Sequence, residues 1–403
     1  MSNRHRTVII GVQGTLQLLA AMTAIRHREK QFPDVINHYI LVIYDLFSKE
    51  RDIAFVKAIF DLSSLWDFDA KIFLDAPMMK KVIRGFYTRK KKIDILHKII
   101  GVSRVDEVYL CRNYIGSVSN FILNAYPDSI KITYGDGYGT VSHRKFFEKL
   151  RYKSNNIIHQ GINEFKTKFK EAIFFILGWK FDIIEFDLAL LSIPIDYCGG
   201  YLRSIPHEFI PLEVLHGVLD QAKKTVQDIY GDYVKEKIGS QMVDLLLLTS
   251  TFSESKYSSE EKEVDLYINR VLDSVSSGSL IVIKEHPRNS SNVSNLLKYK
   301  LLNLGFKVYC FNDQDFNFIP IELSIGLIKP NLVVSFTSSA TIALALFEDV
   351  KQIPIHPEQV LRKFIFSESV DSMIDYQIIL TDSLLRIKGG WLGGQAIWSR
   401  RTD

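Results

Sequence analysis

Residues 280–288 read LIVIKEHPR, a run of four aliphatic residues that passes directly into charged residues and a proline. Similar short apolar runs recur along the chain and alternate with segments of helical periodicity. The expected strands lie at residues 7–10, 39–44, 70–74, 107–111, 129–134, 244–248, 280–284, 307–310 and 332–335, with a last short one after 352–354. Short apolar strands that alternate with helices are typical of parallel sheets in α/β domains.

The expected helices lie at residues 15–28, 49–62, 80–100, 117–125, 260–276, 291–304 and 339–347. Residues 145–191 are aromatic and basic, lack a strand period and are expected to be helical. Because strand–helix alternation stands on both sides of this segment, the pattern predicts an α/β fold of two Rossmann-like domains facing across a cleft. We place the first domain at residues 1–195 and the second at 196–403, with a hinge near 190–205.

Composition narrows the class of protein further. At about 150 residues per domain, 403 residues favour two domains. A chain with 47% hydrophobic and 24% charged residues is not disordered, collagen-like or a disulfide scaffold. A net charge of +4 is too balanced for a dedicated nucleic-acid binder, so no nucleic-acid partner is expected.

The N-terminal segment and the cysteines indicate where the protein is located and whether it binds a metal. The three cysteines form no CxxC or Cys/His cluster, so neither a metal nor a disulfide framework is expected. The first apolar run is too short for the core of a signal peptide, and no uncharged apolar stretch reaches 18 residues. We therefore expect a cytoplasmic protein, or one on the inner face of the cytoplasmic membrane.

The ends of the strands are the places to look for chemistry, because ligands of open parallel sheets bind outside the carboxyl ends of their strands. Gly135, Asp136 and Gly137 follow the strand at 129–134. Asp136 can act there as a general base or a ligand-binding carboxylate, and the alternative is an Asx-type turn. This segment is not a phosphate loop, because it has neither a GxGxxG before a helix nor a GK[ST] sequence.

The turn after the first strand is uncharged and polar. Its side chains could hydrogen-bond a sugar, and the alternative is a simple turn with Thr15 as the helix N-cap. The candidate residues for acceptor binding are Gln13, Gly14, Thr15 and Gln17.

His286, made rigid by Pro287, follows the strand at 280–284. A histidine at this place can donate a proton or a hydrogen bond to a phosphate, and Lys284 adds positive charge beside it. The alternative is an ordinary loop histidine, since the chain has a second His-Pro pair at His356.

Two further segments suit a nucleotide. Ser338 and Ser339 stand between a strand and a helix, where hydroxyls and free N–H groups form an anion site. Glu322, in an apolar stretch, would suit the diol of a ribose. The alternatives are an N-cap for the serines and a carboxylate that favours the helix dipole for Glu322.

Taken in order, Gly135-Asp136-Gly137, His286-Pro287 and Ser338-Ser339 resemble the motifs of the bacterial sialyltransferases, especially the polysialyltransferase and lipooligosaccharide sialyltransferase families. The motif order covers most of the chain. The resemblance implies a GT-B fold and inverting, metal-independent transfer of sialic acid, or a related nonulosonate, from a CMP-activated donor. CMP-sugar is then a substrate, and no cofactor is expected.

The resemblance also implies roles for single residues. Asp136 matches the general base and His286 the general acid that assists the departing phosphate. Lys284, Pro287, Glu322, Ser338 and Ser339 match the donor side, and the acceptor side comprises Gln13, Gly14, Thr15, Gln17, Gly135 and Gly137. The family has an acidic pair where this chain has Gly135 and Asp136, so acceptor contacts differ at the first position.

Basic residues gather in two clusters of the first half. The first holds Lys80, Lys81, Arg84, Arg89, Lys90, Lys91 and Lys92, and the second holds Arg144, Lys145, Lys149, Arg151 and Lys153. Such clusters suit an anionic membrane surface or a polyanionic glycan, and the alternative is a solvated helix face. The expected partners are thus a CMP-sugar donor, a glycan or glycolipid acceptor of a capsule or lipopolysaccharide, and an anionic membrane.

Two other functions remain open. The first is a GT-B transferase that uses another activated sugar, such as CMP-Kdo or a UDP-sugar. The second is a non-catalytic protein that binds a glycan or a nucleotide on a GT-B scaffold.

Overall fold

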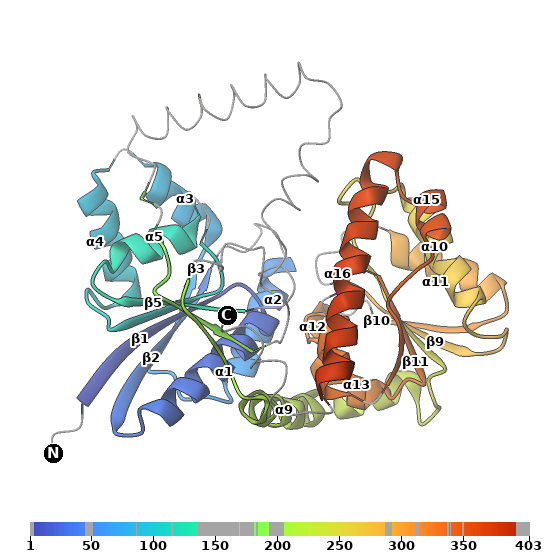
Figure 1. The fold of residues 1–403 in the computed structure, drawn as a ribbon, viewed down its shortest axis with the longest axis horizontal. Coiled ribbons are helices and arrows are strands. Elements are labelled where there is room, and N and C mark those ends of the chain that lie inside the picture. Colours follow the sequence, from blue (N-terminus) through green and yellow to red (C-terminus); the bar gives the residue numbers. More distant parts are fainter. Residues whose placement is uncertain are drawn as a thin grey trace. The chain divides into compact units, whose positions relative to one another are not determined.

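The structure is a computed structural model of the 403-residue chain, which divides into two compact units, Met1–Val218 and Leu219–Asp403 (Figure 1). It describes residues 4–44, 51–85, 87–113, 117–135, 169, 181–182, 184–192, 205–286, 292–311, 314–336, 338, 340–348 and 350–391.

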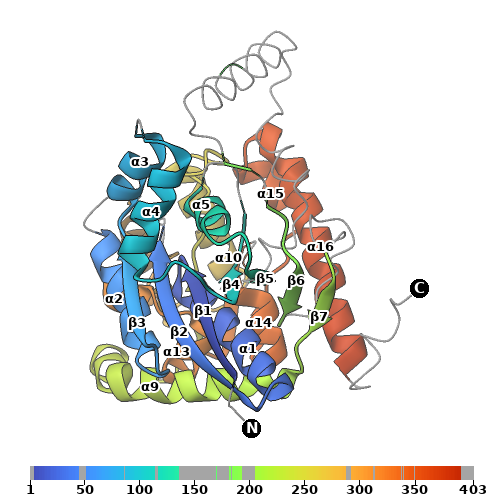
Figure 2. The same ribbon diagram turned by 90° about the vertical axis from the view of Figure 1, so that its left-hand side faces the viewer.

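The first unit is built on a seven-stranded sheet in which every neighbouring pair is parallel. Its strands are β1 (Arg4–Val12), β2 (Val35–Tyr44), β3 (Ala70–Leu74), β4 (Glu107–Leu110), β5 (Ile130–Tyr134), β6 (Leu188–Leu191) and β7 (His207–Phe209). Their order is β3-β2-β1-β4-β5-β6-β7, and Figure 2 shows them side by side. This is the order of a Rossmann-type sheet, with its switch point between β1 and β4.

Helices cover both faces of this sheet (Figure 1). They are α1 (Thr15–Gln31), α2 (Arg51–Ser63), α3 (Ala76–Arg84), α4 (Arg89–Ile100) and α5 (Val118–Ala125). The prediction of one helix over 80–100 is wrong, because α3 and α4 each have their own N-cap. Asp75 accepts a hydrogen bond from the Met78 N–H at 2.9 Å, and Thr88 accepts one from the Lys91 N–H at 3.3 Å.

The second unit repeats the design with five parallel strands in the order β10-β9-β8-β11-β12. The strands are β8 (Leu245–Leu248), β9 (Leu280–Lys284), β10 (Lys307–Phe311), β11 (Leu332–Ser335) and β12 (Lys351–Ile353). The helices are α10 (Glu260–Leu272), α11 (Val293–Asn303), α12 (Gln314–Asn317), α13 (Ile321–Ile328), α14 (Ala340–Phe347), α15 (Glu358–Phe364) and α16 (Ser367–Trp391). The switch point of this sheet lies between β8 and β11.

The predicted α/β fold class is confirmed, since two consecutive Rossmann-like units are the composition of a GT-B protein. The units divide inside α9 (Leu212–Ile238), whereas the predicted boundary is 195/196. The reason is β7, which lies beyond residue 195 and still pairs with β6. The helical prediction for 145–191 is wrong at its end, where Leu188–Leu191 forms β6, and most of that segment lies outside the described residues.

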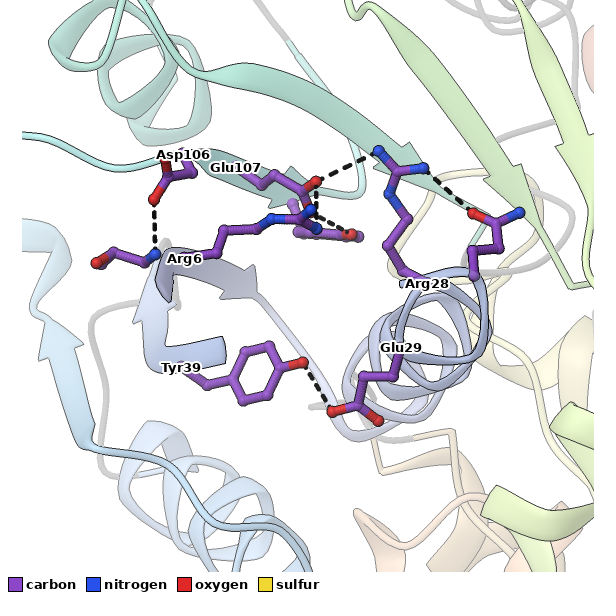
Figure 3. Close-up of polar contacts among 9 residues, drawn as sticks. Arg6, Arg28, Glu29, Tyr39, Asp106 and Glu107 are labelled. Carbon is purple, nitrogen blue, oxygen red and sulfur yellow. Dashed lines mark hydrogen bonds and ion pairs between the residues drawn. The ribbon is translucent and has the colours of Figure 1, made fainter. Parts of the chain in front are cut away.

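A buried polar cluster ties the amino ends of β1 and β4 to α1. Glu107 is buried and accepts hydrogen bonds from Arg6 at 2.9 Å, Arg28 at 3.3 Å and the hydroxyl of Tyr109 at 2.8 Å. Figure 3 shows Arg6 and Arg28 converging on this carboxylate. Because a buried carboxylate is tolerated only with such partners, the cluster holds together this end of the sheet and the end of α1.

None of the helices among the described residues is long and apolar enough to cross a bilayer.

Candidate functional site

The carboxyl edge of the first sheet is closely packed around Gly11, near the end of β1. A Cβ atom on Gly11 would lie 2.3 Å from Cδ2 of Leu110 and 2.9 Å from Cε1 of Tyr44, so any larger residue would have to displace these buried side chains. The Gly11 carbonyl accepts a hydrogen bond from the hydroxyl of Tyr134 at 2.6 Å. This bond anchors the end of β5 to β1, and β5 leads directly into Gly135, which is buried.

The predicted acceptor residues after β1 form the start of α1. Gly14 is the N-cap, and the N–H of Gln13 donates to Oε1 of Gln17 at 2.7 Å. Thr15 is the first helical residue and is buried, so its prediction as the N-cap is wrong. Gln13 and Gln17 are half-buried, which leaves part of each side chain accessible at this edge.

Asp136 and Gly137, the other predicted residues of this edge, lie outside the described residues. The same holds for Pro287 and Ser339 of the second unit.

At the carboxyl edge of the second sheet, a buried carboxylate braces the loop that follows β8. Glu263 of α10 is 1% exposed and accepts hydrogen bonds from the hydroxyl of Tyr267 at 2.7 Å and the N–H of Ser253 at 2.7 Å. The Tyr267 hydroxyl in turn accepts the Ser250 N–H at 2.7 Å. Burial, followed by the negative charge of Glu263, raises the pKa of Tyr267 well above its ordinary value. The loop after β8 is therefore held by two side chains of one helix.

His286, the predicted general acid, follows β9 and is half-buried. Its backbone N–H donates to Oγ1 of Thr249 at 3.1 Å, which links the ends of β9 and β8. The histidine thus stands at the carboxyl edge of the second sheet, on a backbone fixed by the end of the neighbouring strand β8.

Lys284, the last residue of β9, points into the protein. Its ammonium donates to the carbonyls of Asn317 at 3.0 Å and Phe316 at 3.3 Å. Burial lowers the pKa of Lys284 to about 7, and the charge of Glu322 opposes that shift. In this structure Lys284 fixes the chain that enters α13.

Glu322 lies in the first turn of α13 and is buried. Burial raises its pKa to about 7, and the positive charge of Lys284 opposes the shift. The structure therefore brings two predicted donor residues, Lys284 and Glu322, into electrostatic interaction inside the second unit.

Ser338 stands in the turn between β11 and α14. Its Oγ accepts a hydrogen bond from the N–H of Ala340, the first residue of α14, at 3.3 Å. Capping and anion binding are compatible, because the first turn of a helix offers several N–H donors. Just before it, the ring of Phe336 meets Tyr267 edge-on at 5.0 Å and stacks on His356 at 4.0 Å.

Thr249, Glu263 and Tyr267 are the residues of this edge that the sequence analysis missed. Thr249 directly follows β8. It could have been found by the strand-end rule, by which His286 was selected because it follows the carboxyl end of a parallel strand. The other two lie inside a helix, and only their contacts in the folded unit reveal them. The part of the chain that the structure describes contains no group of three or more His, Cys, Asp or Glu that could hold a metal ion.

Comparison with known proteins places the chain among glycosyltransferases. The model of the alpha-2,8-polysialyltransferase (POLYST) family matches residues 56–355. No curated protein sequence matches significantly. The matched range contains every predicted catalytic and donor-binding position, and the resemblance predicted from the motifs is confirmed.

Solved structures with a similar fold have low sequence identity. UDP-GlcNAc 2-epimerase from Neisseria meningitidis, bound to UDP-GlcNAc, is 11% identical with a TM-score of 0.49, over 95% of this chain and 91% of that chain. The GT-B domain of a sialyltransferase from Photobacterium damselae is 11% identical with a TM-score of 0.42, over 93% and 97%. Similarities of this size carry no argument about activity. The family match does, because it spans well over half of the sequence: the chain belongs to the alpha-2,8-polysialyltransferase family and is a sialyltransferase-type glycosyltransferase.

Proposed function

We propose that this protein transfers sialic acid, or a related nonulosonate, from a CMP-activated donor onto a glycan or glycolipid of a capsule or lipopolysaccharide. The observation that carries the proposal is the family match, whose range, residues 56–355, spans the positions of the three motifs. The second unit supports it, because His286 and Ser338 both follow strands of one sheet at its carboxyl edge. Nucleotides bind at this edge in open α/β sheets.

The proposed reaction is an inverting displacement. Asp136 takes the proton of the acceptor hydroxyl as that oxygen forms the new glycosidic bond. The bond between the sugar and the CMP phosphate breaks, and its electron pair goes to the phosphate oxygen. His286 donates a proton or a hydrogen bond to that oxygen, while Ser338 and the N–H groups at the start of α14 stabilise the phosphate charge.

The other predicted residues bind the two substrates. On the acceptor side stand Gln13, Gly14, Thr15, Gln17, Gly135 and Gly137, and on the donor side Pro287 and Ser339. Lys284 and Glu322 are buried, so we assign them a role in shaping the donor side through the start of α13. The reaction as proposed needs no metal or cofactor, since the leaving group is a monophosphate.

Nucleotide binding tests the donor class. The melting temperature is measured with CMP, CDP, UMP and UDP, and CMP is expected to stabilise the protein most, because ligand binding to the native state raises stability. Hydrolysis and transfer are then assayed with CMP-sialic acid, CMP-Kdo and a UDP-sugar. Preference for UMP or UDP would contradict the CMP donor and favour another GT-B transferase, and binding without turnover of any donor would favour a non-catalytic protein.

We also propose that the protein associates peripherally with an anionic membrane at the inner face of the cytoplasmic membrane. The support comes from α4, where Lys90 and Lys91 of the first turn and Lys98 of the last turn are exposed around a shallow groove that Asp94 and Ile95 also line. Lys92 does not belong to this surface, because it is buried and donates to the Ile83 carbonyl at 2.8 Å. The second basic cluster lies outside the described residues.

Flotation with liposomes tests the membrane proposal. The wild-type protein is expected to float with vesicles that contain anionic lipid at low salt and to dissociate at high salt, because exposed charges are screened. Replacement of Lys90, Lys91 and Lys98 by Glu should abolish flotation. No flotation of the wild type at low salt would contradict the proposal.

A further inference from the structure

His356, in the second His-Pro pair of the sequence, lies just beyond β12 and is 4% exposed. Its Nε2 is 2.8 Å from the carbonyl oxygen of Ser335, the last residue of β11. Its ring stacks on that of Phe336, with centroids 4.0 Å apart and planes inclined by 14°. One side chain thus contacts two consecutive residues at the start of the turn that carries Ser338.

His356 is itself held by α16. Its backbone N–H donates to Oε1 of Gln377 at 2.6 Å, and Nε2 of the same glutamine donates to the His356 carbonyl at 3.2 Å. Gln377 is buried as well. The amide of Gln377 therefore fixes the backbone of His356 at both its N–H and its carbonyl, while the imidazole is held by the Ser335 carbonyl and the ring of Phe336.

The imidazole has a definite proton arrangement. Burial lowers the pKa of His356 to about 4, so the ring is neutral near pH 7. A neutral ring that faces a carbonyl oxygen with Nε2 must carry its proton there. Nδ1 is then an acceptor, and it has no hydrogen-bond partner among the described atoms.

The unpaired Nδ1 lowers stability, so packing alone would favour an apolar ring of the same shape at this position. What histidine adds at this position is the Nε2–H donor to Ser335. This hydrogen bond holds the carbonyl of Ser335 at the end of β11, three residues before Ser338.

We propose that His356 is a positioning residue that fixes the β11–α14 turn and thereby sets Ser338 and its neighbouring N–H groups for the donor phosphate. The inference rests on the proposed function for its ligand. Phe336 transmits the restraint, because its ring is held by His356 on one side and by Tyr267 on another. His356 is not expected to touch the substrate.

Two variants separate the effect of the Nε2–H hydrogen bond from the effect of the ring's packing. His356→Phe keeps a ring against Phe336 and removes the Nε2–H, whereas His356→Gln supplies an amide N–H in place of the ring. His97→Phe is the matched control, because Nε2 of His97 contacts the Ala125 carbonyl at 2.9 Å and its ring lies 4.9 Å from that of Tyr126, in the first unit.

The first measurement is hydrogen–deuterium exchange of the peptide that covers residues 335–345, which needs no ligand. We expect exchange to be about tenfold faster in His356→Phe, a loss equal to one net hydrogen bond, with partial recovery in His356→Gln and no change in His97→Phe. Unchanged exchange in His356→Phe would overturn the inference, even if no nucleotide binds.

The second measurement compares CMP with cytidine, which lacks the phosphate. His356→Phe should bind CMP about tenfold more weakly than the wild type and bind cytidine equally well. An equal loss for both ligands, or no loss for CMP, would overturn the assignment to the phosphate turn. Failure of the wild type to bind CMP would count against the proposed donor instead, and the exchange result would then decide the role of His356.

Discussion

Replacement of Tyr267 by Phe tests how far the buried carboxylate in α10 supports the carboxyl edge of the second sheet, where we propose that the donor binds. The change removes one hydroxyl that donates to Glu263 and accepts the Ser250 N–H, both at 2.7 Å. The ring itself stays, so its packing on Phe336 is retained.

The size of the effect follows from these two bonds. A hydrogen bond to a charged group contributes about 1.5–3 kcal/mol, and an unpaired buried donor adds about 1–3 kcal/mol. Ser250 is half-buried, so water recovers part of the second contribution. We expect the free energy of unfolding to fall by about 2–3 kcal/mol, and a unit of this size to melt about 4–12 °C lower.

Tyr109→Phe is the matched control. Tyr109 is also buried and also donates to a buried carboxylate, Glu107, at 2.8 Å, but no bond to a backbone N–H is lost and two arginines remain on Glu107. We expect a smaller loss of about 1–2 kcal/mol.

Urea unfolding followed by circular dichroism measures the stabilities, and calorimetry measures CMP binding. Tyr267→Phe is expected to weaken CMP binding by about five- to tenfold, because the loop after β8 loosens, while Tyr109→Phe leaves it unchanged. The reasoning is refuted if Tyr267→Phe loses no stability, or if both variants affect CMP binding equally.

Three further perturbations check other parts of the structure. Lys284→Met and Glu322→Gln should each lower the free energy of unfolding, measured in urea titrations, by about 3 kcal/mol, because each leaves a buried group without its counter-charge. The double variant should lose less than the sum of the two single losses. Additive losses would exclude the interaction between the two residues. The pKa of His356 is lowered to about 4 from 6.5, so the unfolded chain binds more protons between these values and stability is lost as pH falls from 6.5 to 4. Removing the imidazole should reduce that pH dependence by about 3 kcal/mol, and an unchanged pH profile of unfolding would contradict the assignment. Gly11→Ala would place Cβ 2.3 Å from Leu110 and should cost about 1–3 kcal/mol of stability, measured by thermal unfolding; a neutral effect would mean that the edge is looser than described.

The strands most easily predicted from the sequence are those whose pattern is local. β3, β9 and β11 have the predicted bounds. β9 and β11 are short apolar runs buried in a sheet, whereas β3 is a half-exposed edge strand whose bounds are marked by Asp69 and Asp75 on either side. β7 was missed, since the three residues His207–Phe209 show no apolar run and become a strand only by pairing with β6.

The site shows the same division. The strand-end rule selected His286 and Ser338 correctly as residues of the carboxyl edge, because chain direction alone places them there. The rule also placed Lys284 beside the donor phosphate, but in the structure its ammonium turns inward to the carbonyls of Phe316 and Asn317, more than thirty positions away in the sequence. Glu263 and Tyr267 depend on similar long-range contacts, and a one-dimensional pattern does not contain them.

The most direct test of the proposed catalysis is the rate of sialic acid transfer from CMP-sialic acid to a sialylated glycan acceptor. Asp136→Ala and His286→Ala are compared with the wild type and with two controls at exposed positions, Asp128→Ala and His5→Ala. We expect each catalytic variant to lose about 100-fold or more in rate, while both controls keep the wild-type rate. Near-normal transfer by Asp136→Ala or by His286→Ala would contradict the proposed mechanism.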